Sequence, residues 1–202
     1  MIVPDNQLSH IQAAEIIRSG GVIAFRTDTF YGLGADPFNR NAIATIRKLK
    51  GREDNKPILL LISDADEVER YIAKRSETLD SIAKRFWPGP LTLIGLACPE
   101  LPEELTAGTK TIGLRLPNEE NVRALVRACG GALTATSANV SGKQPARTAK
   151  EVEEYFPEGI DLMIDGGEVT ATQPSTVVDL SSSEARLIRE GAVDREMLED
   201  WL

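Results

Sequence analysis

The sequence predicts an α/β protein: one domain with a large, twisted, mixed β-sheet and helices on its faces. Short apolar runs alternate with amphipathic segments of helical spacing along most of the 202 residues. Near the end of the chain the apolar runs follow one another more closely, which favours a mixed sheet over a purely parallel one. No internal repeat or linker-like stretch divides the chain. We therefore expect residues 1–202 to form a single domain.

The first two elements are a helix and a strand. Residues 7–21 place isoleucine and alanine at helical spacing and end in Gly-Gly, which is typical of an amphipathic helix with a glycine cap. Residues 21–27 are a short apolar run that follows these glycines, and they predict a buried strand.

The next pair repeats this order. Residues 39–51 predict a helix that begins at Asn39 or Asn41 and ends at Gly51. Residues 57–63 begin with a proline and continue as an unbroken apolar run. Such a run predicts a strand that is buried on both faces.

The rest of the chain continues this pattern. Helical spacing is found in residues 64–75, 76–87, 118–131, 146–156 and 193–202. Strand-like apolar runs are found in residues 91–97, 111–117, 132–138, 160–167, 175–181 and 184–191.

Composition limits the chemistry. The formal charge of −8 and the pI near 4.9 argue against broad nucleic-acid binding, although a local basic site remains possible. His10 is the only histidine, and we expect it on the surface of the first helix, so catalysis has to come from other groups. Two cysteines, no run of eighteen apolar residues and no signal-like N-terminus predict a cytoplasmic protein without a membrane span.

Polar residues gather where strands end, which is where open α/β sheets place ligands. The first such segment, residues 26–36, reads RTDTFYGLGAD and offers hydroxyls, a carboxylate and two glycines. It is either a turn satisfied by its own hydroxyls or a place where a ligand approaches the backbone closely. It contains no Walker loop and no GxGxxG fingerprint.

Five cations lie within residues 47–56: Arg47, followed by Lys48, Lys50, Arg52 and Lys56 of the segment KLKGREDNKP (residues 48–57). One interpretation is a capped, solvated helix end that includes Arg47 and Lys48. A second is an anion site in which Arg52 supplies a planar fork for phosphate oxygens and Lys50 a point charge. A third is an RNA patch, which the lack of interleaved aromatic residues disfavours.

Two further segments leave two interpretations open. Arg115 stands inside the apolar run TIGLRLP, either as a carboxylate clamp or at an edge or on the surface of the sheet. In LTATSANVSGKQPART, residues 133–148, a cluster of hydroxyl and amide residues either caps the next helix or contributes to a site; it consists of Thr134, Thr136, Ser137, Asn139 and Ser141. Ser175 and Thr176 start a later strand, and Arg189 lies in LIREGA.

Taken together and in order, these segments resemble the YrdC-like family of threonylcarbamoyl-adenylate synthases. The resemblance is carried by TDTFYGLGAD, KLKGREDNKP, LRLP, TSANVSG, DGG, STVVDL and LIREGA, and it spans about residues 6–192. The Lys50-Gly51-Arg52 and Ser137-Ala138-Asn139 elements are its most specific marks. We expect the minimal, single-domain form of the family, and the resemblance implies a concave basic cavity over the sheet.

The resemblance implies a reaction that joins L-threonine, bicarbonate and ATP into threonylcarbamoyl-adenylate and releases pyrophosphate. The product serves the modification of adenosine in tRNA, so tRNA or tRNA-modification proteins are possible partners downstream. Mg²⁺ is expected with ATP, held by ATP oxygens and water rather than by dedicated protein ligands.

The resemblance also implies roles for individual residues. Those implied to bind ATP are Lys50, Arg52, Lys56, Thr111, Ser137, Asn139 and Arg189, of which Lys50 and Arg52 would be catalytic through charge stabilisation. Those implied to bind threonine are Thr29, Tyr31, Arg115 and Ser175, with the Gly32 backbone beside them.

The sequence departs from the family at one position and leaves two alternatives. Leu61 stands where many members have a histidine, which leaves amino-acid selectivity open. The alternatives to a synthase are an RNA-binding module that uses the basic cavity and a related enzyme that forms or transfers carbamoyl-adenylate. The sequence does not determine the oligomeric state.

Overall fold

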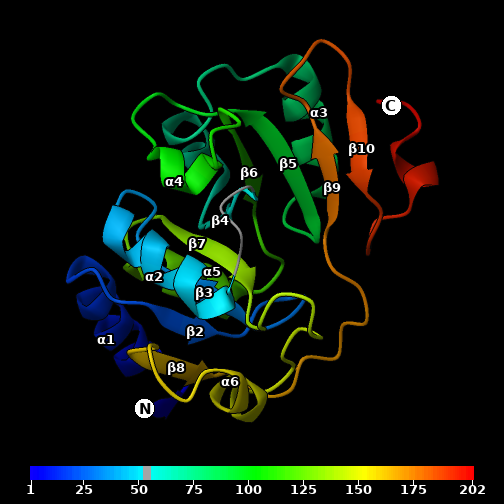
Figure 1. Ribbon diagram of the computed structural model, residues 1–202. Helices are drawn as coiled ribbons and strands as arrows, with labels where there is room; N and C mark the ends of the chain where they lie inside the picture. Colours follow the sequence, from blue (N-terminus) through cyan, green and yellow to red (C-terminus); the bar gives the residue numbers. More distant parts are fainter. Residues whose placement is uncertain (52–55) are drawn as a thin grey trace.

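A ten-stranded mixed sheet organises residues 1–51 and 56–202, the part of the chain that the structure, a computed structural model, describes (Figure 1). Its strand order is β1-β8-β2-β3-β7-β4-β6-β5-β9-β10. The pairs β1–β8, β2–β8, β4–β6 and β5–β9 are parallel, and the other five pairs are antiparallel. The predicted mixed sheet is confirmed.

The strands are short, and most lie within the predicted apolar runs. Their bounds are Ile2–Pro4 (β1), Ile23–Phe25 (β2), Gly32–Gly34 (β3), Leu59–Ile62 (β4), Leu91–Leu96 (β5), Thr111–Arg115 (β6), Ala132–Ser137 (β7), Leu162–Asp165 (β8), Thr176–Asp179 (β9) and Arg186–Arg189 (β10).

The helices are Gln7–Arg18 (α1), Arg40–Lys50 (α2), Glu77–Phe86 (α3), Glu103–Thr106 (α4), Glu120–Ala128 (α5) and Ala149–Tyr155 (α6). Asn39 caps α2 by accepting a hydrogen bond from the Ala42 amide, and Gly51 ends it with a φ of 57°, as predicted. No described helix combines the length and the apolar character that crossing a membrane requires.

Helices cover the sheet on both faces. The smaller core joins α1 and α5 to one face through residues such as Ile17 and Leu125. The larger core joins α2, α3, α4 and α6 to the other face through residues such as Ile46 and Ile82. Strand β4 contributes Leu60 to the larger core and Leu61 to the smaller one, so its predicted burial on both faces is confirmed.

The expected surface position of His10 is wrong. The sequence offers no strand pattern before the first helix, yet β1 pairs with β8 there. The chain then turns at Asp5, whose Oδ1 lies 2.6 Å from Nε2 of His10, and the histidine is only 8% exposed. His10 is therefore a buried partner of Asp5 at the start of α1.

The helices predicted at residues 64–75 and 193–202 are shorter than expected. Each is a 3₁₀ helix, at Ala65–Arg70 and Arg195–Leu198. The first ends because Tyr71 and Ile72 enter the core, where Ile72 forms a β-bridge with Ala97. Tertiary packing here overrides helical spacing.

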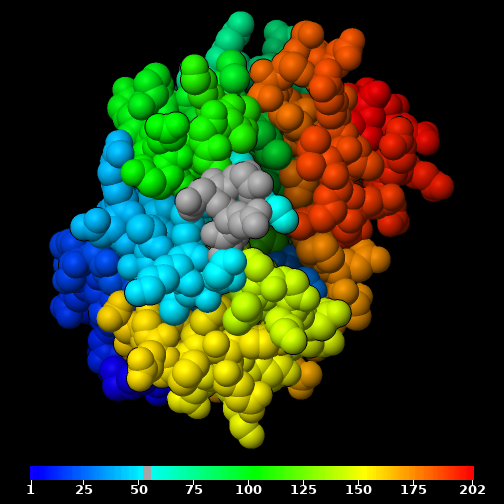
Figure 2. Space-filling view, in the orientation of Figure 1, coloured from blue at the N-terminus to red at the C-terminus, as the bar shows by residue number. Residues whose placement is uncertain are grey.

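The C-terminal segment forms one side of the face seen in Figure 2, where β9, β10 and the last residues, in orange and red, occupy the upper right. The yellow segment around α6 lies at the bottom of the same view. Strand β9 joins the sheet through β5. Residues near position 175, at the start of β9, thereby belong to the same sheet as β2 and β6, the strands that lead into two loops of the site.

Candidate active site

A cavity of about 590 Å³ opens over the sheet, a volume typical of a small-molecule site. Its strand residues, among them Leu59, Thr92 and Gly113, alternate along the chain with residues of the larger core. The predicted site residues that line it are Thr29, Tyr31, Arg115, Ser137, Ser175 and Arg189. Among its described lining residues, two are arginines and none is acidic, as expected for a basic cavity.

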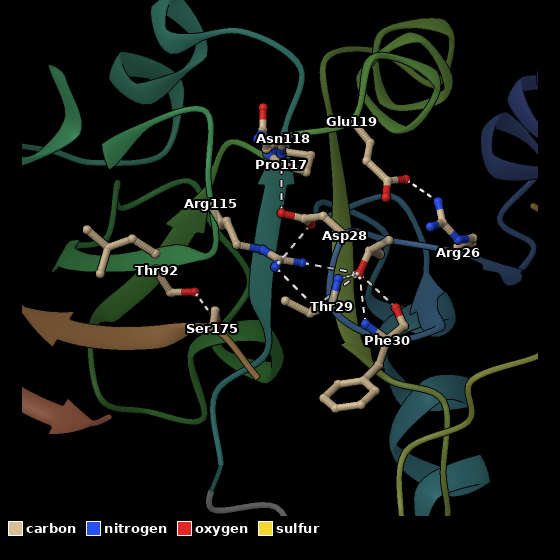
Figure 3. A network of polar contacts seen from close by, with 12 residues as sticks. Arg26, Asp28, Thr29, Phe30, Thr92, Arg115, Pro117, Asn118, Glu119 and Ser175 are labelled. Atoms are coloured by element: carbon tan, nitrogen blue, oxygen red, sulfur yellow. Dashed lines mark hydrogen bonds and ion pairs between the residues drawn. The ribbon is translucent and has the colours of Figure 1, made fainter. Parts of the chain in front are cut away.

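Arg115, at the end of β6, is buried in the wall of this cavity and points toward the loop between β2 and β3 (Figure 3). Its Nη1 donates a hydrogen bond to Thr29 Oγ1 over 3.1 Å, and its Nη2 donates to Thr27 Oγ1 over 3.4 Å. Asp28 Oδ1 lies 3.2 Å from Nη1 and forms an ion pair with it. Arg115 is thus neither an edge residue nor a surface residue.

Burial lowers the pKa of Arg115, and the nearby charge of Arg189 lowers it further. The carboxylates of Asp28 and Glu119 oppose this shift. Arginine remains charged at neutral pH in spite of such shifts. The cavity wall therefore carries a fixed positive charge.

Thr27 organises the loop that presents Thr29. Its hydroxyl donates to the Phe30 carbonyl over 2.7 Å and accepts hydrogen bonds from the amides of Thr29 and Phe30. The interpretation of this segment as a turn satisfied by its own hydroxyls is therefore confirmed. The same turn also brings Thr29 into the cavity, so the two interpretations of the segment are compatible.

Tyr31 reaches under the cavity to the end of β8. Its hydroxyl donates to Asp165 Oδ1 over 3.1 Å and to the Gly167 carbonyl over 2.9 Å. Burial, and then the charge of Asp165, raise the pKa of Tyr31. The phenol therefore stays protonated at physiological pH and joins Tyr31, which lines the cavity, to the segment at the end of β8.

We expect Tyr31→Phe to lower the free energy of unfolding by about 1 kcal/mol, because the hydrogen bonds of the phenol to Asp165 and Gly167 are lost. Urea denaturation measures this, with Tyr155→Phe on α6 as the control. An unchanged stability combined with a strongly raised threonine requirement would contradict this structural role and place the phenol against a ligand.

Ser175 and Arg189 form another part of the wall. Ser175 is buried, and its Oγ lies 3.0 Å from Thr92 Oγ1. Arg189, on the edge strand β10, donates from Nη2 to the Ser175 carbonyl over 2.8 Å. Loss of hydration lowers the pKa of its guanidinium, which lines the cavity.

Lys50 and Asn139 lie behind the cavity wall. Lys50 is buried and donates from Nζ to the carbonyls of Ser137 and Asn139 and to Asn139 Oδ1. Asn139 also accepts a hydrogen bond from Ser137 Oγ and donates to the carbonyls of Val140 and Lys143. The lysine thus ties the end of α2 to the loop after β7; its predicted role at ATP phosphates stays a prediction.

The remaining predicted residues lie elsewhere. Thr111, at the start of β6, contacts Thr109, and neither it nor the exposed Lys56 lines the cavity formed by the described residues. Arg52 lies outside the described residues. Lys48 is exposed, as the solvated helix end predicts, but Arg47 is buried and donates to the Glu104 carbonyl. The prediction that Arg47 is solvated is therefore wrong.

A second cavity, of about 650 Å³, lies between α2 and α4. Charges of both signs line it, from Arg47 and Lys48 on one side and Glu103 and Glu104 on the other. It contains none of the residues predicted to bind ATP or threonine, so we do not assign the site to it.

Sequence reasoning assigned no function to Thr92, Gln144 and Thr172, which also line the cavity. Thr92 could have been found, because it alternates with the buried Leu91 and Leu93 and so faces the other side of the sheet. Gln144 and Thr172 lie in loops, where no periodicity marks a residue's direction.

Comparison with known proteins shows the family of this chain. A family model for Sua5, YciO and YrdC, described as telomere recombination, matches residues 15–191. A protein of Pyrococcus abyssi named threonylcarbamoyl-AMP synthase is 37% identical over 187 residues, which cover 93% of this chain and 55% of that relative. The chain therefore spans about half the length of this curated relative.

Two further comparisons differ in coverage. A threonylcarbamoyl-AMP synthase of Thiobacillus denitrificans is 38% identical over 168 residues, which cover 83% of this chain and 89% of the relative. The solved structure of P. abyssi Sua5 complexed with L-threonine superposes with a TM-score of 0.95 at 34% identity, over all of this chain and 61% of that one.

Proposed function

Because the chain belongs to the Sua5/YciO/YrdC family, we propose that its cavity is the active site of an L-threonylcarbamoyladenylate synthase. The observation that carries the proposal is the convergence of Arg115, Arg189, Ser175 and Thr29 in one cavity. Relatives named as synthases favour an enzyme over an RNA-binding module.

The reaction joins L-threonine, bicarbonate and ATP. The amine of threonine first takes up bicarbonate to give a carbamate, with loss of water. A carbamate oxygen then attacks the α-phosphorus of ATP, the bond to the β-phosphate oxygen breaks, and pyrophosphate leaves. The enzyme is in this sense a nucleotidyltransferase.

The chain's own residues contribute position and charge in this proposal. The carboxylate of threonine lies against Arg115 and Thr29, where two donors are already fixed in a buried wall. Ser175 closes the same pocket, and Arg189 lies toward the nucleotide together with Ser137. Such fixed donors lower the barrier because they need no rearrangement as charge develops.

Magnesium enters this scheme as MgATP. Within the described residues no group of three histidine, cysteine, aspartate or glutamate side chains gathers to hold a metal. An ion bound through phosphate oxygens and water fits such a site, and it would offset the charge of the phosphates. We further propose that the product is consumed in the cytoplasm, in the modification of tRNA adenosine.

Pyrophosphate release is the assay for this function. With ATP and bicarbonate, we expect release to require an amino acid, with kcat/KM about tenfold or more lower for serine than for threonine, since serine lacks one methyl group. Equal release with threonine, with serine and without any amino acid would contradict the proposal. Release that needs no amino acid but requires added carbamoyl phosphate would favour a carbamoyl-adenylate enzyme.

A further inference from the structure

The buried ion pair between Asp28 and Arg115 is a feature that the proposed reaction leaves unexplained. Asp28 Oδ1 makes no hydrogen bond within the described part of the chain, so the adjacent guanidinium is what compensates its charge. Arg115 Nε is also buried without a hydrogen-bond partner among the described residues. Two charges buried together are costly to desolvate, which makes a purely stabilising role for the pair a poor explanation.

The other contacts of Arg115 are too weak to fix its guanidinium alone. Its hydrogen bonds to the hydroxyls of Thr29 and Thr27 span 3.1 and 3.4 Å and involve neutral acceptors. The contact with Asp28 instead joins two opposite charges whose atoms lie 3.2 Å apart, at a site where little water screens the attraction between them. The carboxylate of Asp28 is therefore the partner that decides where the guanidinium lies.

Asp28 is itself held from the other side. Its Oδ2 accepts a hydrogen bond from the Asn118 amide over 3.2 Å, which joins the β2–β3 loop to the β6–α5 loop. The same two loops are also joined by an ion pair between Arg26 and Glu119 (Figure 3). Figure 3 shows Asp28 between Arg115 and the Pro117–Asn118 backbone. The hydrogen bond from Asn118 thus holds the carboxylate of Asp28 independently of its contact with the guanidinium.

We propose that Asp28 is a positioning residue, which fixes the guanidinium of Arg115 in the cavity wall so that the amino acid's carboxylate meets a preset donor. The inference rests on the proposed function for the identity of the ligand. It assigns Asp28 no contact with substrate. If Asp28 acted through its charge alone, removing that charge would strengthen threonine binding, because an acidic neighbour weakens the attraction of Arg115 for a carboxylate.

Asp28→Asn separates the two roles. Positioning predicts a rise of about tenfold in the KM for threonine, with the KM for ATP within about twofold of wild type, a difference of 1.4 kcal/mol per factor of ten. Tighter threonine binding in this variant would overturn the proposal. The matched control is Glu119→Gln, which removes the other ion pair between these loops but does not contact Arg115; an equal effect there would overturn the proposal as well.

Asp28→Glu covers the case in which the asparagine variant fails to fold. It keeps the charge but moves the carboxylate by one methylene, so positioning predicts a raised KM for threonine. An unchanged KM in a folded glutamate variant would overturn the proposal.

Nitrogen NMR of the arginine side chains tests the inference without any activity. We expect separate Nη signals for Arg115 in the wild type, identified by their loss in Arg115→Lys, and merged signals in Asp28→Asn because the guanidinium rotates freely. Separate signals in both proteins would overturn the positioning role. The NMR signals can differ between the wild type and Asp28→Asn while the wild type releases no threonine-dependent pyrophosphate. That result would refute the proposed function and leave the positioning role of Asp28 standing.

Discussion

Replacing Arg115 with methionine is expected to lower kcat/KM for threonine by about a hundredfold or more, because losing one partner of a buried charged contact costs roughly 3 kcal/mol. The KM for ATP should change far less, since the guanidinium faces Thr29 rather than the wall that carries Arg189. Steady-state pyrophosphate release at varied threonine and varied ATP measures both. Equal losses for the two substrates would contradict a role at the carboxylate.

The same variant should be less stable by about 1–3 kcal/mol, because Oδ1 of Asp28 stays buried without its partner. The control is the double variant Asp28→Asn with Arg115→Met, which removes both charges. We expect the double variant to recover most of the stability but none of the activity. Recovery of threonine-dependent activity in the double variant would show that Arg115 acts only on stability.

Lys50→Met should be the second most damaging change. Its ammonium group binds three oxygens of the segment Ser137–Asn139, and Ser137 lines the cavity. Losing the hydrogen bonds of this charged donor to the loop is expected to cost about 3 kcal/mol of unfolding free energy. It should also lower kcat at saturating threonine and ATP by about a hundredfold. Thermal unfolding and pyrophosphate release measure the two effects.

Lys48→Met is the matched control for this change. It removes the same charge from the same helix, but Lys48 is exposed and Lys50 is buried. We expect this control to retain the stability and activity of the wild type. Equal effects of the two substitutions would mean that the helix charge, and not the contact with the loop after β7, is what matters.

Much of the fold could be predicted because burial leaves periodic marks in the sequence. The run from Pro57 to Ser63 is apolar at every position except its last, and β4 is indeed buried between two cores. Elements without such a pattern were missed. β1 is three residues long with an exposed Ile2, β3 is only Gly-Leu-Gly, and α4 has four residues.

The sequence predicts which residues form the site, but it does not predict how they contact one another. Motif order indicated Thr29, Arg115 and Ser175, and the sheet places all three in one cavity. The contacts between them could not be foreseen, because Arg115 and Thr29 lie 86 positions apart in the chain and meet only through the strand order. A local pattern reports which face a residue occupies, but it does not report which side chain lies opposite.

Lys50 shows the same limit from another direction. Its position beside Gly51 at the end of α2 is readable from the sequence as a helix end. Its burial is not, because it depends on the loop after β7, 87 positions later in the chain. A charged residue near a helix end is usually solvated, and only the tertiary structure reveals the oxygens that surround this one.

The central claim is that this cavity makes threonylcarbamoyl-AMP, and isotope-labelled product analysis tests it most directly. The protein is incubated with ATP, L-threonine and ¹³C-bicarbonate, and the nucleotide products are identified by mass spectrometry. We predict threonylcarbamoyl-AMP that carries the label, in an amount matching the pyrophosphate released, and its loss in Arg115→Met. Pyrophosphate release without a labelled threonine adduct, or an adduct that Arg115→Met forms as well as the wild type, would contradict the account.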